Sequence, residues 1–104
     1  MPFKAIDNLP PIHPGELLKD ELDALGMSAR KFAAHIGVPA NAVTSILNGR
    51  RAISAAMAQR LGKAFATGPR YWMMLQSNFD EKLSRTALAA AIKAIKPLSR
   101  QAAE

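Results

Sequence analysis

The sequence predicts an all-α fold that is built around two short helices joined by a tight turn. Apolar residues recur at helical spacing along most of the chain, and no stretch shows the apolar–polar alternation of a half-buried strand. Glycine, proline and serine stand at the junctions between these stretches, where helices end and begin. The length of 104 residues suits one small domain, or one domain with a tail.

An extended arm and a scaffold helix are expected at the start of the chain. Residues 1–13 contain three prolines and lack helical periodicity. Pro14 suits the first position of a helix, and Glu16 gives its first turn the acidic side chain that the helix dipole favours. Leucines spaced four and three residues apart supply an apolar stripe, and Gly26 ends the helix. The acidic residues of this helix lie mostly on its other side, so we expect a solvated acidic face there.

Residues 28–51 carry the pattern of a helix-turn-helix. Ser28 is placed to cap the first of its helices with a side-chain oxygen, and Gly37 to end it in the left-handed conformation. Pro39 suits the start of the second helix, which ends at Asn48. Each helix has one apolar stripe for packing against the rest of the domain. In DNA-binding proteins with this arrangement, the second helix enters the major groove.

Three more helices are expected in the second half of the chain. Ser54 caps the first of them, and Gly68 separates it from the second, which begins at Pro69. The composition changes after Arg85, and the apolar spacing beyond it predicts a further amphipathic helix that stops at Pro97. The resulting division of the chain is an arm at 1–13, a DNA-binding and dimerisation domain at 14–85, and a C-terminal helix and tail at 86–104.

Basic residues are concentrated in the middle of the chain. The formal net charge is +6. Residues 24–79 contain seven lysines and arginines and no acidic residue, whereas the rest of the chain carries a small negative charge. A surface of this kind attracts polyanions, of which nucleic acid is the most common, and we expect it to extend to Arg60 or Lys63. The alternative is a surface that is basic without a specific partner.

The composition gives little support to an enzyme, a metal site or a membrane protein. There is no cysteine, which excludes disulfides and thiolate metal sites and fits a reducing cytoplasm. Neither His13 nor His35 has a neighbour suited to nucleophilic or metal chemistry, and no glycine-rich phosphate loop occurs. No apolar run is long enough to span a membrane, and no signal peptide is evident. We therefore expect a cytoplasmic protein without a catalytic site, a metal or another cofactor.

The outward positions of the second helix have the residue types that read DNA bases. Asn41 can form two hydrogen bonds with adenine, Thr44 and Ser45 offer hydroxyl groups, and small methyl groups can touch thymine. Phosphate contacts need cations or amides beside the groove. The alternative is a solvated helix face without a ligand. Base reading is assigned to Ala40, Asn41, Thr44 and Ser45, and phosphate binding to Arg30, Asn48, Arg50 and Arg51.

A second stretch of interest begins at Trp72. Tryptophan and methionine are enriched in the buried centres of protein interfaces, and a symmetric DNA reader needs a dimer to reach two half-sites. The alternative is that the aromatic residues only complete the core of one protomer. Both can also hold on different faces of the helix, with Trp72 and Leu75 inward and Met73, Met74 and Phe79 partly toward a partner. The dimer interface is assigned to Trp72, Met73, Met74 and Phe79.

Four segments of the chain resemble one family of regulators. They read PIHPGELLKDELDALGMS, FAAHIGVPANAV, ILNGRRAIS and AQRLGKAFATGPRYWMMLQ. The span from about Pro11 to Arg85 resembles the HigA-type (VapI-like) antitoxins of the XRE helix-turn-helix superfamily. The Asn-Gly-Arg-Arg corner and the Ser-capped helix after it are shared by many XRE proteins. The His-Pro-Gly opening and the Trp-x-x-Leu-Gln ending are more specific to this branch.

The resemblance implies a five-helix, lambda-repressor-like domain that dimerises on a palindromic operator and represses its own operon. It also implies a partner, a HigB-like toxin that cleaves mRNA on the ribosome and that the antitoxin neutralises. In the family the first turn of the helix-turn-helix faces DNA, which adds Ala29 to the phosphate-side residues. The chain departs from the family at Ala29, where many XRE proteins have a DNA-contacting glutamine, and at Ala42, where relatives often have a basic residue.

Two other functions stay open at this point. A stand-alone XRE regulator without a toxin would have nearly the same domain, because DNA reading and toxin inhibition use different surfaces. A purely protein-binding helical adaptor would show no salt-dependent DNA binding. Co-purification with the product of the neighbouring gene and a gel shift on the protein's own promoter distinguish these alternatives.

Overall fold

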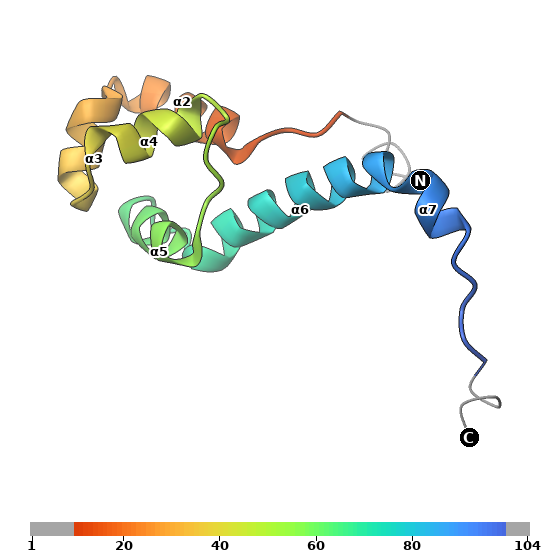
Figure 1. Cartoon of the computed structure of the whole chain (residues 1–104). Helices are drawn as coiled ribbons and strands as arrows, with labels where there is room; N and C mark the ends of the chain where they lie inside the picture. Colours follow the sequence, from red (N-terminus) through yellow and green to blue (C-terminus); the bar gives the residue numbers. More distant parts are fainter. Residues whose placement is uncertain (1–9, 100–104) are drawn as a thin grey trace.

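Helices make up all the regular structure of residues 10–99, which are the residues that the computed structural model describes (Figure 1). The prediction of an all-α fold is confirmed, with five helices forming the domain and a short one following them. Most of the predicted N-terminal arm, residues 1–9, lies outside the described residues. The helices are α2 (Pro14–Leu25), α3 (Ala29–Ile36), α4 (Ala40–Leu47), α5 (Ala55–Ala64), α6 (Pro69–Ala87) and α7 (Ala89–Lys93).

Serine caps begin two of the helices, as predicted. The Ser28 hydroxyl accepts a hydrogen bond from the backbone N–H of Lys31 at 3.1 Å, and the Ser54 hydroxyl accepts one from Met57 at 3.1 Å. Each cap satisfies one of the N–H groups that the first turn of a helix leaves without a partner. Gly37, at φ 75°, ends α3 in the left-handed conformation, so both ends of the first helix of the helix-turn-helix are fixed locally.

His13 belongs to the start of α2 rather than to the arm. Its Nδ1 accepts a hydrogen bond from the backbone N–H of Gly15 at 2.9 Å, which makes it the N-cap residue of α2. Its ring meets the ring of Phe79 edge to face, with 4.9 Å between the centroids. The sequence showed only a histidine without a chemical partner, whereas the structure shows a residue that joins the start of α2 to α6.

The core is formed by one face of each of the helices α2 to α5 and by the beginning of α6. α3 packs on α4, α2 on α4, and α5 on α6. Gly15 marks a very close approach, because a Cβ atom added there would overlap the backbone carbonyl of Ile46. This glycine therefore lets α2 pass directly against the end of α4. The large, fully buried side chains include those of Leu18, Phe32, Val43, Ile46, Leu61 and Trp72.

Trp72 lies inside the protomer. Its side chain is 1% exposed, and its ring packs beside the rings of Phe65 and Tyr71. Its Nε1 donates a hydrogen bond to the hydroxyl of Thr67 at 3.0 Å, so the polar end of the indole is also satisfied within the chain. The structure corrects the assignment of Trp72 to the dimer interface, because an indole buried within one protomer has no surface left for a second.

The helix α6 projects beyond the body of the domain and carries α7 at its far end (Figure 1). A helix end was expected near Arg85, but α6 continues to Ala87 and α7 begins directly after Leu88. The molecule is elongated, with extents of 57 × 30 × 25 Å and a radius of gyration of 17.7 Å, against about 13 Å for a compact domain of similar length. Exposed apolar side chains on this projection are those of Leu83, Leu88, Ile92 and Ile95. Within residues 10–99, no helix has the length and apolar character that crossing a membrane requires.

Candidate nucleic-acid interface

The outer face of α4 presents the predicted base-reading side chains. Val43 and Ile46 are fully buried and hold the opposite face of this helix on the body of the domain. Because an α-helix turns by about 100° per residue, positions 40, 41, 44 and 45 lie on the side of the helix opposite these two residues. The side chains of Ala40, Asn41 and Thr44 are exposed, and that of Ser45 is half-buried. The structure thus brings the four predicted readers together on one accessible face.

Two positions at which the chain departs from the resembled family are covered by their surroundings. Ala42 is 6% exposed and belongs to the core, so it lies away from the predicted reading face. Ala29, which was predicted on the phosphate side, is half-buried and packs against the same core. The methyl group of Ala29 cannot form a hydrogen bond. A phosphate could therefore be bound at this position only by the backbone N–H in the first turn of α3.

The basic corner, residues 49–53, follows α4 directly. The backbone carbonyl of Ser45 accepts hydrogen bonds from the N–H groups of both Arg50, at 2.9 Å, and Arg51, at 3.1 Å. Gly49, at φ 73°, allows this reversal, because the left-handed conformation costs glycine little. Both arginine side chains are exposed and start from the end of the helix that carries the readers. The predicted phosphate-binding cations therefore lie next to the predicted reading face.

The N-termini of three successive helices carry no acidic side chain. Arg30 is exposed in the first turn of α3, and the first turns of α3, α4 and α5 all lack Asp and Glu. The first turn of α2, in contrast, contains Glu16. A helix N-terminus has free N–H groups and a partial positive charge, which an acidic side chain would neutralise and which a phosphate can use. The absence of acidic side chains from the first turns of α3, α4 and α5 favours the approach of a polyanion to these helices.

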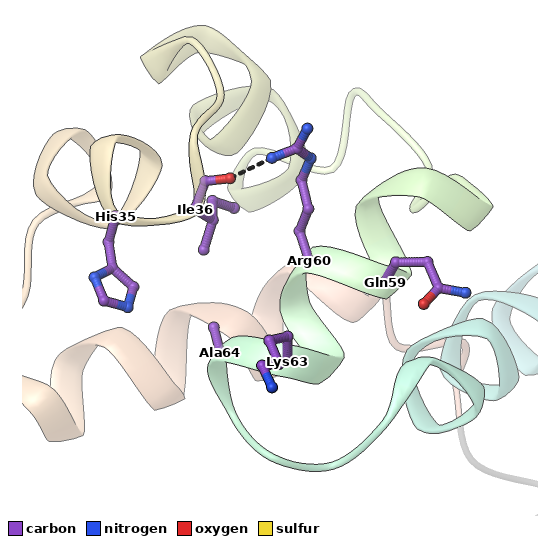
Figure 2. Close-up of a pocket in the computed structure, with 6 residues that line it drawn as sticks. All are labelled: His35, Ile36, Gln59, Arg60, Lys63 and Ala64. Carbon is purple, nitrogen blue, oxygen red and sulfur yellow. Dashed lines mark hydrogen bonds between the residues drawn. The ribbon is translucent and has the colours of Figure 1, made fainter.

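Arg60 and Lys63 lie on α5. Figure 2 shows them beside His35 and Ile36, around an open pocket of about 350 Å³ at the C-terminal end of α3. The guanidinium of Arg60 donates a hydrogen bond to the backbone carbonyl of Ile36 at 2.5 Å, which satisfies one of the carbonyls that a helix end leaves free. Arg30 lies at the opposite end of the same helix. Arg60 therefore caps the end of α3, while its side chain stays exposed, and the extension of the DNA-facing surface to Arg60 or Lys63 stays a prediction.

The other residues assigned to the dimer interface differ in their accessibility. Met73 is 41% exposed and Met74 is 59% exposed, so both offer apolar surface to a partner. Phe79 is half-buried, and one side of its ring is covered by His13. The two methionines are therefore the accessible members of the predicted interface.

A groove of about 510 Å³ lies between the basic corner and α6. Ala52 and Ile53 line it from the corner, and the residues that line it from α6 include Met73, Asp80 and Glu81. Arg85 donates a hydrogen bond to Glu81 at 2.9 Å, and this bond holds the pKa of the Glu81 carboxyl below its usual value. The groove consequently combines an apolar side chain with an acidic edge.

Gln76, the last residue of the Trp-x-x-Leu-Gln ending, has a role in this region that the sequence did not reveal. It is 6% exposed, its Oε1 accepts a hydrogen bond from the backbone N–H of Ile53 at 2.8 Å, and its Nε2 donates one to Asp80 Oδ1 at 2.9 Å. A signal was available in the sequence. Gln76 follows Trp72 by four residues and so lies on the same stripe of the helix, where a buried polar side chain needs hydrogen-bond partners.

Comparison with known proteins gives consistent matches. A profile of the helix-turn-helix family matches residues 18–72. Virulence-associated protein A' of Dichelobacter nodosus is 44% identical over 71 residues, which cover 67% of this chain and 62% of that protein, so the chain spans less than two thirds of its length. Antitoxin HigA-1 of Vibrio cholerae is 32% identical over 89 residues, which cover 85% of this chain and 84% of that protein.

Solved structures share the fold as well. An addiction module antidote protein of a HigA family from Coxiella burnetii matches with a TM-score of 0.84 at 44% identity, over 86% of this chain and all of that chain (100%). Pseudomonas aeruginosa antitoxin HigA, solved with the higBA promoter, matches with a TM-score of 0.81 at 41% identity, over 86% of this chain and 99% of that chain. The helical arrangement described above is therefore also that of an antitoxin solved with DNA.

Proposed function

Since the chain belongs to the helix-turn-helix family and, within it, to the HigA-type antitoxins, we propose that it is a sequence-specific repressor that controls its own operon and acts as the antitoxin of a toxin–antitoxin pair. One observation carries the DNA-binding half of this proposal: α4 has an accessible polar face with two exposed arginines at its end. The antitoxin half is supported by the likeness, over most of the chain, to antitoxin HigA proteins.

In this proposal α4 is the recognition helix. Its buried side fixes its rotation about its own axis, so that the polar face enters the major groove. Asn41 pairs through its side-chain amide with the edge of an adenine, and Thr44 contacts a neighbouring base through its hydroxyl or its methyl group. The Ser45 hydroxyl and the Ala40 methyl group complete the reading face. Specificity then comes from side chains whose positions are set by the packing of α4 on the core.

Cations and backbone N–H groups hold the phosphates on either side of the bases. The backbone of Arg50 and Arg51 is fixed by the Ser45 carbonyl, which leaves both side chains to reach the DNA backbone. Asn48 adds an amide at the end of α4. Arg30 and the N-terminus of α3, including the N–H of Ala29, supply a further site for a phosphate.

A second copy of the chain completes the DNA site. Two protomers place two α4 helices on half-sites about 34 Å apart, and this symmetry requires a palindromic operator. The exposed Met73 and Met74 on α6 suit the interface. The projecting half of α6 also needs a cover, because a helix without tertiary packing is only marginally stable in water.

The toxin of this pair is a HigB-like protein that cleaves mRNA. The chain neutralises it by binding and carries out no catalysis itself. Both binding activities place the protein in the cytoplasm, where the operator and the toxin are found. A stand-alone regulator without a toxin is the alternative function, and it shares the DNA-binding half of the proposal.

Two measurements test the two halves separately. Binding to the protein's own promoter and to a scrambled duplex is compared by fluorescence anisotropy at physiological salt, where a specific reader prefers its site by at least about a thousandfold. Equal affinity for the two duplexes would refute sequence-specific repression, and the absence of salt-dependent binding to either duplex would favour a protein-binding adaptor. Co-expression with the neighbouring reading frame tests the antitoxin half. Promoter binding without co-purification of the neighbour and without relief of its toxicity would leave a stand-alone regulator.

A further inference from the structure

The basic corner is tied to α6 by a side chain that lies far from it in the sequence. The Oε1 of Gln76 accepts a hydrogen bond from the backbone N–H of Ile53 at 2.8 Å, and 23 residues separate the two. We propose that Gln76 is a positioning residue for DNA binding, which fixes the path of the basic corner and thereby the placement of Arg50 and Arg51 on the phosphates. The inference rests on the DNA binding proposed above and adds a residue that does not touch DNA.

The corner needs such a tie because it has no regular structure of its own. The segment between α4 and α5 consists of turn, bend and irregular residues, so individual hydrogen bonds determine its path. At its start, the Ser45 carbonyl binds the N–H groups of both arginines. At its end, Ile53 is 3% exposed, and Gln76 supplies the acceptor for its N–H. The two arginines therefore lie in a segment whose backbone is held by hydrogen bonds at both ends.

Asp80 sets the direction in which the Gln76 amide points. The Nε2 of Gln76 donates a hydrogen bond to Asp80 Oδ1 at 2.9 Å, which leaves Oε1 to face Ile53. If the amide were turned around, its NH₂ group would meet the N–H of Ile53 and its oxygen would meet the carboxylate of Asp80, so both contacts would be repulsive. The acceptor at position 76 is thus held in place by a charged neighbour one helical turn away.

His13 links the start of the corner to the same stretch of α6. The ring of Phe79, three residues after Gln76, packs against His13. The Cγ atom of His13 lies 3.9 Å from the position that a Cβ atom would occupy at Gly49, the first residue of the corner. One end of the corner is therefore bonded to α6 directly, through Gln76, and the other end lies near His13, which packs on α6.

Filling space would not require a polar side chain here. Methionine has a similar length and is common on buried helix stripes, but its sulfur is a poor hydrogen-bond acceptor. Gln76→Met therefore keeps most of the packing and removes the acceptor for Ile53. This difference separates a positioning role from a packing role.

The test measures operator affinity across a series of salt concentrations for the full chain and its variants. At about 0.1 M salt, the loss of one phosphate contact weakens binding by about tenfold and makes the slope of log K against log salt shallower by about 0.9. Gln76→Met is expected to lose at least this much, because two arginines depend on the corner. Gln59→Met, on the exposed surface of α5, is the matched control and is expected to bind like the wild type.

A pair of variants tests the hydrogen-bond chain itself. Gln76→Glu places a second carboxylate beside Asp80 and is expected to weaken binding as Gln76→Met does. Adding Asp80→Asn reverses the bond: the introduced asparagine donates to the introduced carboxylate, which still accepts from Ile53. The double variant is expected to recover the wild-type slope and affinity. Asp80→Asn alone controls for the removed negative charge. Recovery in the double variant beyond the change that Asp80→Asn alone produces is not expected from a packing role or from net charge.

The outcomes separate this inference from the function on which it rests. A wild-type protein without preference for its operator would refute the proposed function. A wild-type protein that binds specifically, with Gln76→Met lowering only the unfolding temperature while affinity and slope stay unchanged, would overturn the positioning role alone. If Gln76→Met does not fold, Gln76→Glu and its double variant with Asp80→Asn decide the question, since failure of the second substitution to restore binding would also overturn the inference.

Discussion

Replacing Arg51 by alanine removes a cation and leaves the backbone of the basic corner in place. The N–H of Arg51 binds the Ser45 carbonyl at 3.1 Å through the main chain, which the substitution does not change. The side chain is exposed, so little packing is lost. We therefore expect the free energy of unfolding to change by less than about 0.5 kcal/mol, while DNA affinity falls on every sequence.

The size of the loss follows from counterion release. Each phosphate that the protein neutralises adds about 0.9 to the salt slope on duplex DNA, so Arg51→Ala is expected to make the slope shallower by about that amount. At about 0.1 M salt this is a tenfold loss of affinity, or about 1.4 kcal/mol. Arg50→Ala is expected to behave alike, because its backbone is held by the same carbonyl. Operator and random DNA should lose equally, since phosphates carry no sequence information.

The assay is fluorescence anisotropy with operator and random duplexes between about 0.05 and 0.2 M salt. Lys93→Ala is the matched control, because it removes the same charge from α7, at the far end of the projecting helix α6 (Figure 1). Its slope should stay close to that of the wild type. An unchanged slope in both arginine variants would refute the phosphate assignment. An equal decrease in Lys93→Ala would show that net charge, rather than the basic corner, drives binding.

Three further substitutions address the reading face, the core and the dimer. Asn41→Ala is expected to cost about 1–3 kcal/mol on the operator and to relax preference at one base pair; an equal loss on random DNA would show that Asn41 reads no base. Gly15→Ala is expected to lower the free energy of unfolding, measured in urea, by about 1–3 kcal/mol, because the added Cβ overlaps the carbonyl of Ile46; an unchanged midpoint would mean that α2 can shift without cost. Met74→Glu places a charge on an exposed apolar position of α6 and is expected to dissociate the dimer in sedimentation experiments while circular dichroism retains the helices. A dimer of unchanged strength would place the interface elsewhere.

The beginnings and ends of the first helices could be predicted from the sequence because their chemistry is local. A serine three residues before the N–H that it caps, or a glycine at a helix end, acts within one turn of the chain. Helical spacing likewise predicted which side of α4 is accessible, since Val43 and Ile46 must share one face. Local patterns therefore predicted most of the helices and the exposure of the proposed base-reading residues.

Contacts between distant parts of the chain could not be predicted in this way. Spacing placed Trp72 on an apolar stripe but could not decide whether its own protomer or a partner covers it. Charge counting placed Arg60 on the basic surface but could not reveal that its guanidinium caps the end of α3. The hydrogen bond between Gln76 and Ile53 depends on how α6 returns to the basic corner. Each of these outcomes is decided by tertiary packing, which a repeating pattern within one helix does not encode.

The salt slope gives the number of phosphates that the proposed clamp neutralises. Arg30, Arg50 and Arg51 are the exposed arginines that are proposed to bind phosphates in one protomer. A dimer then offers six arginines, and a salt slope of about −5 is expected if each neutralises one phosphate, against about −3 for a monomer. Dilution across the dimer dissociation range should move the slope from the larger value to the smaller one. A slope near −3 at concentrations where sedimentation shows only dimer would mean that one half-site is left unbound, and the symmetric reading of a palindromic operator would then be refuted.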